Sequence, residues 1–149
     1  MIHEIMYPST FSESTIKLNM GLFMIELIKN SDRMEKKEEA SINHYLVVES
    51  LKYIEEQFKD ASLYELAEQL KQSHYGLSKT IKKVTSRTFK ELLQERRLEK
   101  AKELLEGTDM SIGAIVEQVG YDNISYFYRI FKGKYGQTPK ELREQTMRG

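Results

Sequence analysis

Two stretches of the chain carry basic side chains at matching positions. In the first, Lys79 is followed by Lys82 and Lys83, and in the second, Arg129 is followed by Lys132. An arginine can donate two parallel hydrogen bonds to guanine and a lysine one or two, and both side chains also bind phosphate. Contact with phosphate alone is the alternative for Lys79 and Arg129, whereas Lys82, Lys83 and Lys132 fit phosphate better. The chemistry indicated is non-covalent recognition of a nucleic acid.

These basic stretches occupy equivalent places in an internal repeat. Residues 62–92 and 111–142 are similar: Ser62 matches Ser111, 49 residues later, and Thr88 matches Thr138, 50 residues later. One extra residue lies near Asp122-Asn123, where a turn is expected. Two copies of a short helix, a turn and a basic helix indicate two helix-turn-helix units in tandem. Such a unit places one helix in the major groove of DNA.

The net charge of zero conceals an uneven distribution of charge. Two windows contain basic residues and no acidic residue, and each coincides with the second helix of a repeat. Their basic residues are Lys71, Lys79, Lys82, Lys83, Arg87 and Lys90 in the first window and Arg129, Lys132, Lys134 and Lys140 in the second. A polyanion requires a local positive face rather than a positive total. Solvated helix surface is the alternative reading of any single basic run.

The apolar spacing predicts the helices that position these side chains. Ser62-x-x-Glu65 and Thr88-x-x-Glu91 have the form of capping boxes, so helices are expected over 63–70 and from 89 to about 106. The helix between them, about 74–85, should bury Leu77, Ile81 and Val84. Before these helices, residues 43–58 are expected to form a further amphipathic helix.

The second copy shows the same signals. Ser111 begins a helix over 112–119, and Gly120 suits the left-handed residue that closes it. A basic helix then runs to about Tyr135 with its apolar side chains, including Ile130, inward. Thr138-Pro139-x-Glu141 begins a last short helix. No alternating pattern of strand length is found, so the fold class predicted is all-α.

The N-terminal region differs from the repeats. Residues 14–30 are richly apolar and share one helical face through Ile16, Met20, Phe23 and Leu27. Residues 31–41 are charged and are expected to form a linker or an exposed turn. The apolar face requires burial against something, and a symmetric homodimer through Ile16, Met20, Phe23 and Leu27 is the simplest solution. The alternatives are packing on its own domain or on a sensing domain.

Other chemistries lack support in the sequence. The three histidines, His3, His44 and His74, have no metal-ligand spacing, and the chain contains no cysteine. There is no glycine-rich phosphate loop and no G-x-S-x-G or H-E-x-x-H motif. No run of 18 apolar residues and no signal-peptide pattern is visible. We therefore expect no enzyme activity, no cofactor, no metal, no membrane partner and a cytoplasmic location.

Three motifs resemble the AraC/XylS family of bacterial transcription regulators. The first is Arg97-Leu98-x-x-Ala101-x-x-Leu104-Leu105, and the second is Ser111-Ile112-x-x-Ile115 with Val119-Gly120-Tyr121. The third is Ser125-Tyr126-Phe127-x-Arg129-x-Phe131-Lys132-x-x-Tyr135-Gly136-x-Thr138-Pro139-x-Glu141-x-Arg143. The sequence departs from the family pattern at Gly76, at Ser86, where the family usually has glycine, and at Val116, where it usually has alanine.

The resemblance implies an organisation and a partner. Residues 43–149 would be the DNA-binding domain, homeodomain-like, with a first module over 43–88, a linker helix over 89–106 and a second module over 107–145. Residues 1–42 would be a dimerisation element or the remnant of a sensing domain, in a fragment or a reduced regulator. The side chains implied to contact double-stranded promoter DNA are Tyr75, Ser78, Lys79, Lys82, Lys83, Ser125, Tyr126, Tyr128, Arg129 and Lys132.

The predicted function is sequence-specific regulation of transcription. The recognition helices, about 75–85 and 125–135, should lie on one side of the domain and roughly 34 Å apart, the repeat of the major groove. RNA polymerase is a further partner compatible with this function. The alternative function is a helical protein–protein interaction module with helix 14–30 as its partner surface and solvated basic runs.

Overall fold

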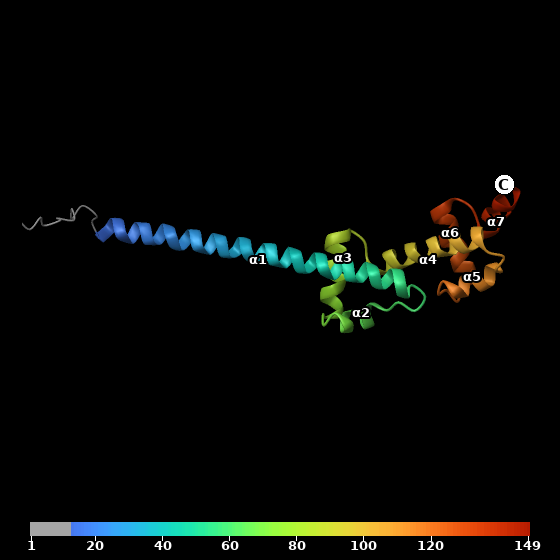
Figure 1. Cartoon of the computed structure of the whole chain (residues 1–149), viewed down its shortest axis with the longest axis horizontal. Helices are drawn as coiled ribbons and strands as arrows, with labels where there is room; N and C mark the ends of the chain where they lie inside the picture. The colour runs from blue at the N-terminus through green and yellow to red at the C-terminus, as the bar shows by residue number, and fades with distance from the viewer. Residues whose placement is uncertain (1–12) are drawn as a thin grey trace, which may run out of the picture. The chain divides into compact units, whose positions relative to one another are not determined.

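The computed structural model describes residues 13–149, with side chains described from residue 17 onward, and this part of the chain is all-α. It divides into two compact units, Met1–Ile42 and Asn43–Gly149. Helix α1, Glu13–Gln57, supplies residues to both units (Figure 1). Within residues 13–149 no helix is both long enough and apolar enough to cross a membrane.

The linker expected over residues 31–41 is wrong, because these residues are helical and continue α1. Their composition explains the difference. Glutamate, lysine, methionine and alanine all have high helix propensity, and Asp32 precedes Lys36 by four residues, the spacing of a stabilising pair on a helix surface. The helices expected over 14–30 and 43–58 are therefore one helix.

The first module packs around one apolar core. Leu46 and Ile54 of α1 meet Leu66 and Ala67 of α2 (Leu63–Gln69) and Leu77 and Ile81 of α3 (His74–Thr85). Ser62 caps α2 by accepting from the Glu65 N–H, but the capping box is only half formed, because the Ser62 N–H donates to the Tyr53 hydroxyl. Val84, expected in the core, is 45% exposed. It shares the helical face of Leu77 and Ile81, but it lies in the last turn of α3 and does not pack against this core.

Helix α4, Phe89–Gly107, is shared by two cores. Its first turns give Phe89 and Leu93 to the core of the first module, and its later turns give Leu98, Ala101 and Leu105 to that of the second. The capping box of Thr88 and Glu91 is fully formed and begins the helix. The predicted linker helix is thus a structural part of both modules.

The second module gathers around the C-terminal half of α4 (Figure 1). It consists of α5 (Ile112–Gln118), α6 (Ile124–Tyr135) and α7 (Pro139–Arg148). Phe127 and Phe131 of α6 are fully buried among the residues of α4, α5 and α7. Ser111, Asn123 and Thr138 cap the three helices, and Thr138 forms the expected box with Glu141, whose pKa is lowered mainly by the backbone hydrogen bond at Thr138.

Equivalent turns of the two modules use different residues. After α2 the left-handed position is Lys71, with φ 54°, whereas after α5 it is Gly120, with φ 95°. After α3 it is Ser86, with φ 62°, and after α6 it is Gly136, with φ 72°. The first module therefore holds side chains in a conformation that favours glycine.

Candidate nucleic-acid interface

The two candidate recognition helices, α3 and α6, present the predicted side chains at equivalent positions. Lys79 on α3 and Arg129 on α6 are both exposed, and each lies six residues after the N-cap of its helix. Each also follows a fully buried core residue, Leu77 or Phe127, by two positions. Tyr75 is 75% exposed and Ser78 is half-buried. Both helices therefore carry a long basic side chain whose donors face solvent.

On helix α6, one basic side chain lies against an aromatic ring. The Arg129 guanidinium carbon lies 5.2 Å from the centre of the Tyr126 ring, a distance at which a cation is attracted by the ring face. Ser125 and Lys132 are exposed on the same helix. Tyr128 and Ile130 are half-buried and pack against the second core. The predicted contact of Tyr128 with DNA stays a prediction, and Ile130 is less buried than expected.

Lys82 serves its own helix. Its ammonium donates to the Ser86 carbonyl oxygen at 2.9 Å, at the C-terminal end of α3. The last carbonyls of a helix lack intrahelical donors, and a cation there also complements the helix dipole. Lys83, one residue further, is exposed. The basic end of α3 thus combines helix capping with a positive surface.

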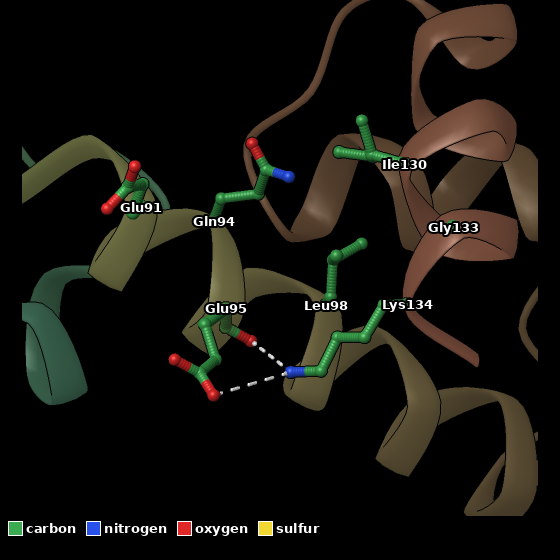
Figure 2. A pocket seen from close by; sticks show the side chains of 7 residues that line it. All are labelled: Glu91, Gln94, Glu95, Leu98, Ile130, Gly133 and Lys134. Carbon is green, nitrogen blue, oxygen red and sulfur yellow. Dashed lines mark hydrogen bonds and ion pairs between the residues drawn. The ribbon is translucent and has the colours of Figure 1, made fainter. Parts of the chain in front are cut away.

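Two basic residues of the acid-free windows, Arg87 and Lys134, contact α4 rather than pointing outward. Arg87 pairs with the Glu95 carboxylate. Lys134 lies 3.9 Å from the same carboxylate and 3.7 Å from that of Glu99, and Figure 2 shows it reaching from α6 to Glu95. These contacts join both modules to the linker helix, so the basic windows contain structural as well as outward-facing charges.

A groove of about 470 Å³ lies above these contacts, between α4 and α6. Figure 2 shows Leu98 and Gln94 of α4 across from Ile130 of α6, with Lys134 at the edge. On the neighbouring surface of α4, burial and then the carboxylates Glu99, Glu95, Glu106 and Glu103 raise the pKa of Tyr135 to about 12. Four carboxylates against the two ammonium groups of Lys102 and Lys134 make this surface less suited to phosphate than the basic faces of α3 and α6.

Sequence reasoning assigned no role to two arginines of the family-like motifs, Arg97 and Arg143. The Arg143 guanidinium donates to the carbonyl oxygens of Leu105 at 3.3 Å, Thr108 at 3.2 Å and Leu104 at 3.5 Å, and to that of Met110. From its place on α7 it thus supplies hydrogen-bond donors to the carbonyl oxygens at the end of α4 and in the following loop. The only sign of this role in the sequence was the position of Arg143, five residues after the Thr138 cap. The carbonyl groups that it contacts lie 33–39 residues away in sequence.

The comparisons with known proteins agree with this geometry. The sequence profile of a family described as "Helix-turn-helix domain" matches residues 66–145. The chain is 33% identical over 104 residues to the xylose operon regulatory protein of Haemophilus influenzae, an alignment covering 69% of this chain and 27% of that protein.

Two further similarities extend the comparison. The bifunctional transcriptional activator/DNA repair enzyme AdaA of Bacillus subtilis is 37% identical over 95 residues, which cover 63% of this chain and 45% of AdaA. Among solved structures, the C-terminal domain of AraT, a response regulator from Geobacillus stearothermophilus, is similar with a TM-score of 0.62 and 38% identity. That similarity covers 67% of this chain and 84% of the AraT domain. The chain thus spans less than half the length of the two curated relatives.

Proposed function

Because the chain belongs to the AraC/XylS family of helix-turn-helix transcription regulators, we propose that it binds promoter DNA by placing α3 and α6 in two adjacent segments of the major groove. The observation that carries the proposal is that Lys79 and Arg129 are both exposed, at equivalent positions of two modules that share one linker helix. A protein–protein interaction module, the alternative function, does not require this equivalence.

The proposal assigns different tasks to the exposed side chains. Arg129 and Lys79 read base edges, because their long donors extend from the middle of each recognition helix. Lys82, Lys83 and Lys132 contact phosphate and fix the position of the helices on the duplex. Residues 43–149 form the DNA-binding domain, and residues 1–42 supply the dimerisation element. We infer no catalytic role, and we assign RNA polymerase as a partner and the cytoplasm as the location.

An electrophoretic mobility shift with genomic fragments tests the proposed function. Binding that depends on phosphate contacts falls steeply with salt for all fragments alike. A sequence-specific regulator should retain some fragments at a salt concentration that releases the others. Loss of all fragments at the same salt concentration would favour the protein–protein alternative.

Arg129→Ala and Lys82→Ala should have different consequences. We expect Arg129→Ala to cost about 1–3 kcal/mol of binding free energy and to relax the preference at one base pair, because bidentate contacts are lost. Lys82→Ala should weaken all sequences evenly and flatten the salt slope by about one unit. Binding titrations with duplexes selected from a random pool, repeated across salt concentrations, measure both effects.

Lys134→Ala is the matched control for Arg129→Ala, because Lys134 lies on the same helix but contacts Glu95 and Glu99. It should leave base preference unchanged. An even loss across all sequences in Arg129→Ala would show that Arg129 contacts only phosphate.

The apolar residues of α1 support a dimer. Met20, Phe23 and Leu27 are 65%, 62% and 48% exposed, and Ile16 lies in α1 with its side chain outside the described residues. Apolar side chains exposed together exceed the patches that soluble monomers usually tolerate. We therefore propose a symmetric homodimer through helix 14–30, which would double the DNA-binding modules.

Phe23→Glu should convert this dimer to a monomer, because two charges would be buried in the interface. Analytical ultracentrifugation of the full chain and the variant at micromolar concentration measures the mass. Lys29→Glu, a charge exchange on the same helix, is the control and should remain dimeric. A monomeric parent chain would refute the dimer, and a dimeric Phe23→Glu variant would refute this face.

A further inference from the structure

Arg97, in the middle of α4, contacts both modules. Its Nε donates to the Phe58 carbonyl oxygen at 2.7 Å and its Nη2 to the Lys59 carbonyl oxygen at 2.9 Å, just after the end of α1. The same guanidinium lies 5.2 Å from the centre of the Tyr121 ring, in the turn that precedes α6. One planar side chain therefore joins the end of the first helix to the turn of the second module.

From Tyr121 the contacts continue to the recognition helix. The Tyr121 and Tyr126 ring centres are 6.0 Å apart, and the Arg129 guanidinium lies over Tyr126 at 5.2 Å. Aromatic pairs and cation–π contacts both prefer particular orientations. A series of contacts thus runs from Arg97 through Tyr121 and Tyr126 to Arg129, the proposed base-reading residue.

The junction leaves little room for independent movement. A Cβ atom at Gly120 would lie 2.4 Å from the Lys59 carbonyl oxygen and 3.0 Å from the Arg97 guanidinium carbon. Burial raises the pKa of Tyr121, and the nearby charge of Arg97 opposes this shift. A groove of about 310 Å³ beside the contact is lined by Arg97, Tyr121, Tyr126 and residues of the first turns of α4. Close packing transmits small displacements rather than absorbing them.

We propose that Arg97 is a positioning residue for DNA readout by the second module: by tying Tyr121 to the carbonyls after α1, it fixes Tyr126 and Arg129 in the orientation that reads bases. The proposal rests on the proposed function. It assigns the residue a specificity role without contact with DNA, and it makes the readout of the second module depend on the position of the end of α1.

Arg96 provides a matched control. It is the preceding residue of the same helix and lies over the Phe58 ring at 5.4 Å. Its Nε is 2.7 Å from a Glu55 carboxylate oxygen, an ion pair without hydrogen-bond alignment. It contacts Glu55 of α1, the Phe58 ring and Glu103 of α4. Arg96→Gln therefore removes an arginine from the same junction without touching Tyr121.

The experiment measures base discrimination separately at the groove segments read by the first and by the second module, the first and second half-sites, of a duplex selected from a random pool by the full chain. Because the chain has no cysteine, Met147→Cys carrying a DNA-cleaving reagent marks the half bound by the second module. Met147 lies in α7 and is 71% exposed. Single base-pair substitutions in each half then give the ratio of affinities for preferred and altered duplexes.

Arg97→Gln should lower discrimination in the second half-site about tenfold, the scale of coupling between contacting residues. Discrimination in the first half-site and the affinity for unselected duplex should stay the same within about twofold, as expected for distant sites. Arg96→Gln should leave both half-sites unchanged. Arg97→Lys, which keeps the charge but not the planar pair of donors, should restore discrimination only in part.

Tyr121→Leu tests the same link from its other side, with the two carbonyl bonds of Arg97 intact, and replaces Arg97→Gln if that variant does not fold by circular dichroism. It should give the same loss confined to the second half-site, and the double variant should lose no more than the larger single loss. Equal losses in both half-sites, additive losses, or a similar loss in Arg96→Gln would overturn the inference alone. A parent chain that selects no duplex would overturn the proposed function and this inference with it.

Discussion

Gly120→Ala is expected to destabilise the unit 43–149 by about 2–5 kcal/mol. The φ angle of 95° costs a residue with a Cβ atom roughly 1–2 kcal/mol. In addition, the new Cβ would lie 2.4 Å from the Lys59 carbonyl oxygen, and forcing such an overlap into packed structure costs typically about 1–3 kcal/mol. Urea unfolding followed by circular dichroism measures the free energy of unfolding.

Gly136→Ala separates the two causes. Gly136 also has a positive φ, 72°, but a Cβ there would meet nothing within 4 Å. We therefore expect about 1–2 kcal/mol, from the backbone alone. Equal losses at the two glycines would mean that the contact between Lys59 and Gly120 is unimportant for stability.

Arg143→Met is expected to cost about 3 kcal/mol of unfolding free energy, because hydrogen bonds from charged donors contribute about 1.5–3 kcal/mol and carbonyls left unpaired add to the loss. The variant keeps the apolar stem but leaves Leu105, Thr108 and Met110 without the donors that α7 supplies. Thermal and urea unfolding of the full chain measure the effect.

Two controls accompany this variant. Arg143→Lys retains one charge but cannot reach several carbonyls at once, so it should recover less than half of the stability. Arg148→Met removes an exposed arginine five residues later on the same helix and should change stability by less than about 0.5 kcal/mol. A loss in Arg148→Met as large as that in Arg143→Met would assign the effect to net charge.

Local signals predicted most of this fold. Caps and apolar spacing act within one or two turns of a helix, so the bounds of α2 to α6 and the start of α7 agree with the prediction to within about two residues. The same reasoning failed for residues 31–41, where polarity suggested a linker although helix propensity is high. It also failed for Val84, which shares the helical face of Leu77 and Ile81 but lies in the last turn of α3, where it does not pack against the core.

The contacts between modules could not be predicted from spacing. Arg97 and Arg143 lie in motifs that resembled a known family, but their partners are carbonyl oxygens 33–39 residues away. Backbone acceptors carry no residue-type signal, so no pattern identifies them. Lys134 likewise counted as part of a basic run, and only the structure turns it toward Glu95 and Glu99.

The sharing of α4 between two cores has a consequence for how the protein can be divided. Phe89 and Leu93 complete one core and Leu98, Ala101 and Leu105 the other, so neither module is whole when severed at this helix. Two domains joined by a flexible loop survive a protease cut between them and can be transplanted one at a time. Here a single cut within α4 would inactivate both modules, and residues 43–149 are the smallest piece to graft onto another protein.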